Sequence, residues 1–209
     1  MVVAGYGWCG RGVAARARGT GADVVVTEVD PVRALDAELD GVRVLPVHRA
    51  AAEADLVVTT TGNRDVVTVE HVRRMEDGAI LASSGHFDLE IAVDDLTRTA
   101  VRRRFVRENC AEHTLPEGHR VLLLAEGRLP GQAAAEAHPA EVVDMTFATQ
   151  ALAVRYLVEN AGELDPAVHP VPKEIEDEVA RAELAAYDVT TGELTPRQRE
   201  YLASWRIGT

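Results

Sequence analysis

The sequence predicts an α/β fold in which a doubly wound parallel sheet is followed by a C-terminal helical extension. Three observations lead to this prediction. Short apolar runs alternate with helical stretches over residues 1–125. Each run is apolar at successive positions rather than at alternate ones, which is typical of strands buried on both faces of a parallel sheet. After Leu129 the chain changes character, because Pro130-Gly131 interrupts it and longer helical patterns follow.

The expected elements of the first part alternate regularly along the chain. The expected strands cover residues 2–4, 24–27, 42–45, 56–60, 79–82 and 121–125, and helices are expected over 10–19, 31–39, 48–54 and 68–75. Asp30-Pro31 places a capping residue before a proline, which is typical of a helix start, and Gly41 follows the end of that helix. This strand–helix succession predicts the doubly wound sheet.

The C-terminal part reads as three helical segments. A long helix is expected over 141–160, because apolar residues such as Val142, Met145 and Leu152 recur at helical spacing and call for an apolar partner. An extended, proline-containing connector, a short helix over 173–186 and a final turn near 196–205 follow.

Composition narrows the class of protein. The chain has 209 residues and a formal net charge of -12, which opposes binding to nucleic acid and to anionic membranes. Three consecutive arginines, 102–104, form one basic cluster, and an edge strand or turn with solvated charges is the favoured reading of it. No apolar run approaches the roughly 20 residues of a membrane helix. With no signal peptide after Met1 and two distant cysteines, a reduced, cytoplasmic protein is expected.

A glycine-rich turn carries the strongest functional signal. Gly5, Gly7 and Gly10 form a G-x-G-x-x-G pattern where the first strand runs into the first helix. Gly5 allows the tight turn, Gly7 lets the backbone approach a pyrophosphate, and Gly10 lets helix and strand pack closely. The N–H groups of the helix start then face the anion.

An acidic residue follows the turn at the expected spacing. Glu28 ends the second strand, where its carboxylate can accept hydrogen bonds from both ribose hydroxyls of a dinucleotide. A structural turn with an incidental glutamate is the weaker alternative. Because the carboxylate repels a 2′-phosphate and no arginine adjoins Glu28 in sequence, we predict a Rossmann-type domain that binds NAD rather than NADP.

Five motifs in order resemble the S-adenosylhomocysteine hydrolase family, also called adenosylhomocysteinase. They are VVAGYGWCGRG, TEVDP, TTTGN, GHFDLEI and LLAEGRL, and the likeness runs to the closing YLASWRIGT. The resemblance implies an NAD-binding domain over 1–137, a hinge and long helix over 138–160 that packs on a substrate domain in the family, and a C-terminal connector with short helices over 161–209. The family's N-terminal substrate domain is expected to be absent from this chain.

The resemblance also implies an activity and a set of site residues. The family uses tightly held NAD to oxidise the ribose 3′-hydroxyl of S-adenosylhomocysteine, which allows elimination of homocysteine, addition of water and release of adenosine. The catalytic residues carried over are His86, near the nicotinamide and the reacting ribose, and His138, at the hinge that closes over the substrate. The cofactor-binding residues carried over are Gly5, Gly7, Trp8, Cys9, Gly10, Glu28, Thr60, Thr61, Gly62, Asn63, Ser84, Gly85 and His86.

Two departures from the family pattern accompany these matches. Gly131 stands where the family has the asparagine that holds the nicotinamide carboxamide, and Thr149 replaces another asparagine in the long helix. The family's catalytic lysine and its aspartate and glutamate partners lie upstream of the matching region. We therefore expect no hydrolysis by this chain alone, and self-association or a separate substrate-domain chain as partner.

Other functions remain open beside this reading. The chain could be a catalytically inactive NAD-binding module that regulates a full-length homologue, or an independent NAD-dependent oxidoreductase. The histidines and cysteines show no metal-ligand spacing, so no metal site is expected. Asp88 and Glu90 are expected to cap the turn that follows them, and Cys9 to pack as a small apolar residue against Trp8 or the sheet.

Overall fold

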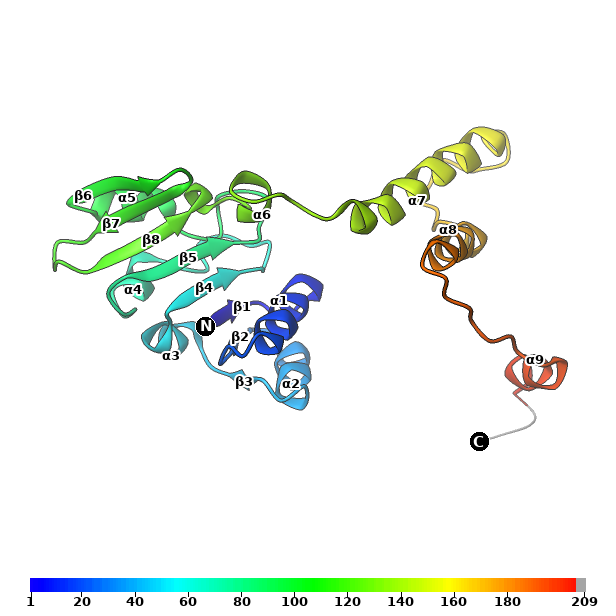
Figure 1. The fold of residues 1–209 in the computed structure, drawn as a ribbon, viewed down its shortest axis with the longest axis horizontal. Coiled ribbons are helices and arrows are strands. Elements are labelled where there is room, and N and C mark those ends of the chain that lie inside the picture. Colours follow the sequence, from blue (N-terminus) through cyan, green and yellow to red (C-terminus); the bar gives the residue numbers. More distant parts are fainter. Residues whose placement is uncertain (206–209) are drawn as a thin grey trace. The chain divides into compact units, whose positions relative to one another are not determined.

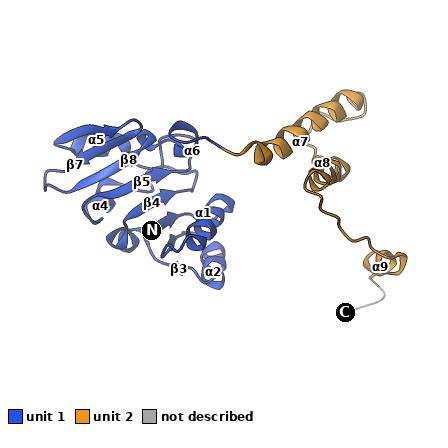
Figure 2. Ribbon diagram, in the orientation of Figure 1, with its two compact units in different colours: residues 1–137 blue, residues 138–209 orange. Residues whose placement is uncertain are grey.

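The structure is a computed structural model that describes residues 1–205 (Figure 1). The chain divides into two compact units, residues 1–137 and residues 138–209, which Figure 2 shows in different colours. Residues 206–209, the last four of the closing family motif, lie outside the described residues.

Unit 1 is built on one eight-stranded sheet within the described residues. Its strand order is β3-β2-β1-β4-β5-β8-β7-β6, with parallel pairing from β3 through β8 and antiparallel pairing for β7 and β6. The strands are β1 Val2–Ala4, β2 Val25–Thr27, β3 Arg43–Val44, β4 Leu56–Thr59, β5 Ala79–Ser83, β6 Arg102–Arg107, β7 Cys110–Thr114 and β8 Arg120–Leu124. The predicted doubly wound α/β fold is confirmed.

Helices cover both faces of this sheet, because successive side chains of a strand point to opposite faces. Val3 of β1 and Val26 of β2 pack with Ala14 and Ala37 of two helices, and Val2 and Val57 belong to a second core cluster on the other face. The helices of unit 1 are α1 Trp8–Gly19, α2 Pro31–Leu39, α3 Val47–Ala50, α4 Val69–Val72, α5 Val93–Thr99 and α6 Pro130–Ala133, with 3-10 turns at Ala51–Glu53 and Ala125–Gly127.

The helix boundaries follow local chemistry. Asp30 caps α2 as predicted, since its carboxylate accepts hydrogen bonds from the backbone N–H groups of Val32 and Arg33. The helix expected over 68–75 is shorter than predicted. The backbone N–H groups of Arg74 and Met75 bond to carbonyls three residues back rather than four, which ends the α-helical pattern.

The β6–β7 hairpin departs from the parallel pattern. The edge strand expected around the three arginines is β6, and all six of its residues are exposed. Two of its four arginines are paired: Arg104 donates two hydrogen bonds to Glu112 on β7, at 2.7 and 3.0 Å, and Arg103 donates one to Glu126 at 2.6 Å. The sequence did not predict β7, which buries Glu112 and His113 among its residues and so lacks an apolar run.

Unit 2 contains the helices α7 Ala140–Glu159, α8 Lys173–Ala186 and α9 Pro196–Leu202. The long helix α7 contacts α8, whose Ile175 and Val179 are buried. Several apolar side chains of α7, among them Val142 and Leu157, stay about half exposed. None of the helices described in residues 1–205 is long and apolar enough to span a membrane.

Candidate functional site

The glycine turn lies where β1 passes into α1, and at Gly5 and Gly10 it leaves no room for a side chain. A Cβ on Gly10 would lie 2.0 Å from the carbonyl oxygen of Gly5, so only glycine allows this contact between helix and strand. Gly5 has φ +102° and lies against Thr60, whose hydroxyl donates to the Ala4 carbonyl at 2.9 Å. These two glycines are explained by the protein's own packing.

Gly7 is different, because nothing inside the protein requires a glycine there. It precedes α1 in extended conformation, and a Cβ on it would come no closer than 3.7 Å to another group, the Arg33 guanidinium. Gly7 lines a pocket, and within residues 1–205 no side chain caps the first turn of α1. A bare backbone with unpaired N–H donors at the start of a twelve-residue helix suits an anionic ligand that approaches closely.

Glu28 is held against this turn by backbone donors. Its Oε2 accepts a 2.8 Å hydrogen bond from Tyr6 N–H, and its Oε1 accepts bonds from Val29 and Asp30 N–H at 2.7 and 3.0 Å. Burial raises the pKa of Glu28, but these three donors and the nearby Arg33 outweigh it and hold the pKa below the ordinary value. A carboxylate offers about four acceptor positions, so Oε2 retains room for a ribose hydroxyl.

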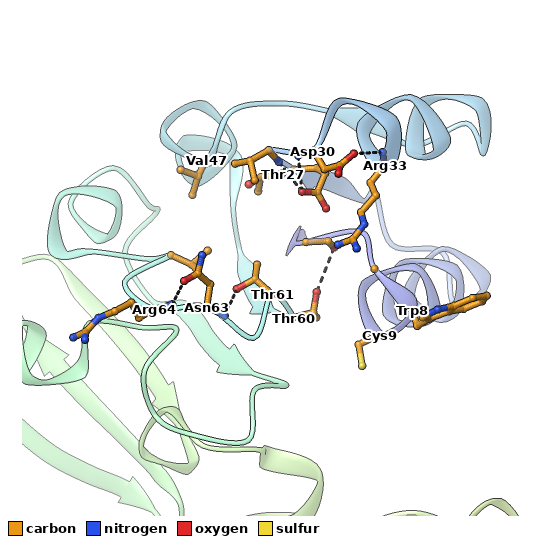
Figure 3. Close-up of a pocket in the computed structure, with 15 residues that line it drawn as sticks. Trp8, Cys9, Thr27, Asp30, Arg33, Val47, Thr60, Thr61, Asn63 and Arg64 are labelled. Carbon is orange, nitrogen blue, oxygen red and sulfur yellow. Dashed lines mark hydrogen bonds between the residues drawn. The ribbon is translucent and has the colours of Figure 1, made fainter. Parts of the chain in front are cut away.

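Arg33 corrects one step of the sequence argument. No arginine adjoins Glu28 in sequence, but Arg33 on the first turn of α2 lies near enough to lower its pKa and lines the same pocket. Figure 3 shows its side chain extending from α2 toward the glycine turn. Within residues 1–205 the guanidinium forms no ion pair of its own. The site therefore presents a carboxylate and an unpaired cation side by side.

The pocket has a volume of about 530 Å³ and lies beyond the carboxyl ends of β1, β2 and β4. The strand order reverses between β1 and β4, and open α/β sheets bind ligands at such a switch point. Eight of the predicted cofactor residues line it, namely Gly5, Gly7, Trp8, Cys9, Glu28, Thr60, Thr61 and Asn63 (Figure 3). Gly10 packs against Gly5 and does not line the pocket. The other predicted cofactor residues outside the lining are Gly62, Ser84, Gly85 and His86.

Cys9, in the turn, lies differently from the prediction. Cys9 is an exposed free thiol at the pocket, so the prediction that it packs as a small apolar residue is wrong. Trp8 is 90% exposed and cannot shield it. Both occupy the first turn of α1, whose outer side faces away from the sheet, while Gly10 and Ala14 face the sheet.

The prediction for Glu90 is wrong. Glu90 does not cap the turn after it, because its buried carboxylate accepts hydrogen bonds from Thr61 and Gly62, nearly thirty residues earlier. Asp88 does not cap it either and lies 3.6 Å from Arg128. Residue spacing does not predict a hydrogen bond between two loops. The one feature of the sequence that indicated a buried role for Glu90 was its carboxylate inside the apolar stretch around Ile91.

The two histidines predicted to be catalytic lie on separate units. His86 is exposed in the loop after β5 and its ring packs edge-on against Phe87, with centroids 5.0 Å apart. His138 is exposed at the start of unit 2. Their catalytic roles remain predictions. Gly131 lies in α6 and, like Thr149, does not line the pocket over the glycine turn.

Fold and site together define a dinucleotide-binding domain of the Rossmann type. A family model described as "S-adenosyl-L-homocysteine hydrolase, NAD binding domain" matches residues 1–137. The chain belongs to the S-adenosyl-L-homocysteine hydrolase family, and NAD is the cofactor of the matching domain.

Curated relatives match the full length of the chain. It is 54% identical over 208 residues to an adenosylhomocysteinase of Saccharolobus solfataricus and 52% identical over 209 residues to that of Gloeobacter violaceus. It is 50% identical over 210 residues to an S-inosyl-L-homocysteine hydrolase of Methanopyrus kandleri. Each alignment covers 100% of this chain and 49–50% of the relative, so the chain spans about half the length of these proteins. A dipicolinate synthase subunit of Bacillus halodurans is 18% identical, with a TM-score of 0.42, over 46% of this chain and 34% of that one.

Proposed function

We propose that this chain is the cofactor half of an S-adenosylhomocysteine hydrolase. It binds NAD over the glycine turn and, together with a substrate domain, supports reversible hydrolysis of S-adenosylhomocysteine to adenosine and homocysteine. The observation that carries the proposal is the pocket over Gly7, where an unshielded backbone and the Glu28 carboxylate meet. The family membership of residues 1–137 supports it.

The residues of the pocket divide the work of holding the cofactor. The N–H groups at the start of α1 hold the pyrophosphate, and Glu28 accepts from the adenosine ribose. Thr61 and Asn63, in the loop after β4, lie along the opposite wall. When bound, NAD supplies reversible oxidation of the substrate's ribose 3′-hydroxyl. By family resemblance His86 then stands near that ribose, and His138 closes over the substrate.

The direct test of cofactor binding is calorimetric titration of the chain with NAD+ and NADP+. We expect NAD+ to bind more tightly. Equal binding of the two, or binding of neither, would contradict the role given to Glu28. A Gly7→Ala variant supplies the sharpest control, because its methyl group meets no protein atom within 3.7 Å. It should leave stability nearly unchanged and weaken NAD+ binding.

The hydrolase activity is tested with and without an added substrate domain. We expect no turnover of S-adenosylhomocysteine by the 209-residue chain alone, and turnover after a substrate domain from one of the relatives is supplied. S-inosylhomocysteine is included as substrate, because one relative carries that description. Turnover by the chain alone that is lost in His86→Ala would show that the proton-transfer groups are present in this half. NAD+ binding with no activity under any of these conditions would favour the inactive regulatory module.

We also propose that unit 2 contributes to assembly, either with a second copy of this chain or with a substrate-domain chain. Val142, Met145 and Leu157 of α7 remain about half exposed although α8 packs beside that helix. Burying the exposed half of four such side chains offers roughly 3–6 kcal/mol before association costs are subtracted. Light scattering after size-exclusion chromatography over a concentration series tests this proposal, and a monomer of 22.6 kDa at every concentration would contradict self-association.

A further inference from the structure

Glu90 carries a buried carboxylate that holds a loop from another part of the chain. The residue is only 2% exposed. Its Oε2 accepts hydrogen bonds from the backbone N–H and the hydroxyl of Thr61, both at 2.8 Å, and its Oε1 accepts from Gly62 N–H at 3.0 Å. Hydrogen bonds to a charged acceptor are stronger than neutral ones, so these three contacts define the position of the loop after β4.

The backbone on either side of Glu90 extends the same connection. Its carbonyl oxygen accepts from Val66 and Val67 N–H, at 2.8 and 3.1 Å, and the carbonyl of Leu89 accepts from Asp65 N–H at 2.8 Å. Val67 and Ile91 form a parallel bridge. Residues 61–67 are therefore held along residues 89–91 by side-chain and backbone bonds together.

The loop after β5 is packed against the same carboxylate. A Cβ on Gly85 would lie 2.4 Å from Glu90 Oε1, so the position of the carboxylate requires a glycine there. Gly85 N–H donates instead to the Ser83 hydroxyl at 3.0 Å. Glu90 thus touches the loop that lines the cofactor pocket through Thr61, and the loop that carries His86.

We propose that Glu90 is a positioning residue for the cofactor: it joins the loops after β4 and β5 and holds Thr61 and Gly62 in the conformation that NAD meets on binding. The inference rests on the proposed function of the pocket. Glu90 itself does not line the pocket, so it acts through Thr61. A loop that is ordered before binding lowers the conformational entropy that binding must overcome.

A Glu90→Gln variant tests the proposal in the full chain. Glutamine keeps the size of the side chain but replaces one oxygen with an NH2 group, so the backbone N–H of either Thr61 or Gly62 loses its acceptor. We expect at least a tenfold rise in the Kd for NAD+ by calorimetry. Glu112→Gln is the matched control, because Glu112 is a second buried glutamate that accepts hydrogen bonds, in its case from Arg104, and it lies on the β6–β7 hairpin outside the pocket.

If Glu90 only stabilises the fold, the two variants should behave alike. Glu90→Gln and Glu112→Gln would then lower the melting temperature to similar extents and leave the Kd for NAD+ at its wild-type value, which would overturn the proposal. If Glu90→Gln fails to fold, Thr61→Val removes the hydroxyl bond to Glu90, and with it the acceptor of Asn63 N–H, while the backbone N–H groups of Thr61 and Gly62 keep the Glu90 carboxylate as acceptor. That variant should raise the Kd about threefold or more, and a wild-type Kd would overturn the proposal.

Hydrogen exchange separates this inference from the proposed function. Without cofactor, the amides of Thr61 and Gly62 should exchange at least tenfold faster in Glu90→Gln than in the wild type, whereas β6 and β7 should not change. Unchanged exchange at Thr61 and Gly62 overturns the positioning of the loop. If the wild-type chain binds no NAD+, the proposed function fails, and the exchange rates still decide whether Glu90 orders this loop.

Discussion

The Glu28 carboxylate accepts a 2.8 Å hydrogen bond from the backbone N–H of Tyr6, which joins the end of β2 to the middle of the glycine turn. The residue proposed to bind the ribose therefore also shapes the turn proposed to bind the pyrophosphate. The groups proposed to bind the ribose and the pyrophosphate of NAD are thus hydrogen-bonded to each other. Changes at Glu28 should consequently affect both.

The first prediction is that Glu28→Ala weakens NAD+ binding by about 1–3 kcal/mol, as expected for hydrogen bonds to a lost charged acceptor. Calorimetry at pH 7 measures the change. Because Tyr6 N–H also loses its acceptor, thermal melting is recorded in parallel. Glu28→Gln keeps one acceptor oxygen and should fall between alanine and wild type. Full NAD+ affinity in both variants would show that the ribose is bound elsewhere.

The second prediction concerns Arg33 and the 2′-phosphate of NADP+. In the wild type the Glu28 carboxylate repels that phosphate, although the Arg33 guanidinium lies nearby. Glu28→Ala removes the repulsion and leaves the cation, so NADP+ should bind this variant more tightly than it binds the wild type. The double variant Glu28→Ala, Arg33→Ala should lose the gain. A gain that persists without Arg33 would show that another group binds the phosphate.

The third prediction is a pH dependence of stability that arises at His113. The side chain is fully buried on β7, and burial, with a smaller effect from the Arg103 charge, lowers its pKa below 6.5. The folded state then binds fewer protons than the unfolded state. The contribution of His113 to the free energy of unfolding is therefore fully present above pH 6.5 and decreases as the pH falls below it. The slope is at most about 1.4 kcal/mol per pH unit for one histidine.

Urea unfolding between pH 7.5 and pH 5 measures this slope. His113→Leu fills a similar volume and should reduce it. Part of the slope should remain, because burial and the nearby His48 and Arg74 also lower the pKa of His71. Carboxylates such as Asp77, whose pKa the Arg120 hydrogen bonds lower to about 2, stay ionised over this range. An unchanged slope in His113→Leu would assign the effect to other groups.

The fourth prediction addresses the missing family asparagine. A Cβ on Gly131 meets no atom within 4 Å, so a side chain fits there without strain. Gly131→Asn should strengthen NAD+ binding by about 1 kcal/mol, the usual worth of one hydrogen bond. Gly131→Ala is the matched control, since it makes the same backbone change without the amide. Equal affinities in the two variants would mean that the nicotinamide carboxamide lies out of reach of this position.

The sequence alone determined the elements that depend on neighbouring residues. The place of Gly5, Gly7 and Gly10 between a strand and a helix was predicted correctly, because the strand, the turn and the helix follow one another within a few residues. The place of Glu28 beside this turn was also predictable, because β1 and β2 are adjacent parallel strands whose carboxyl ends share one edge of the sheet. The Asp30 cap of α2 depends only on the next three residues.

The tertiary structure decided every contact between segments that are distant along the chain. The bonds from Glu90 to Thr61 exist because β4 and β5 lie side by side, which brings the loops after them together. Arg33 acts on Glu28 because α2 turns its first residues back over the end of β2. Strand β7 forms because Arg104 and the sheet supply partners for the buried Glu112. The strand order sets the contact between Glu90 and Thr61, and the path of the chain from β2 into α2 sets the one between Arg33 and Glu28. Residue spacing within one segment carries no record of either.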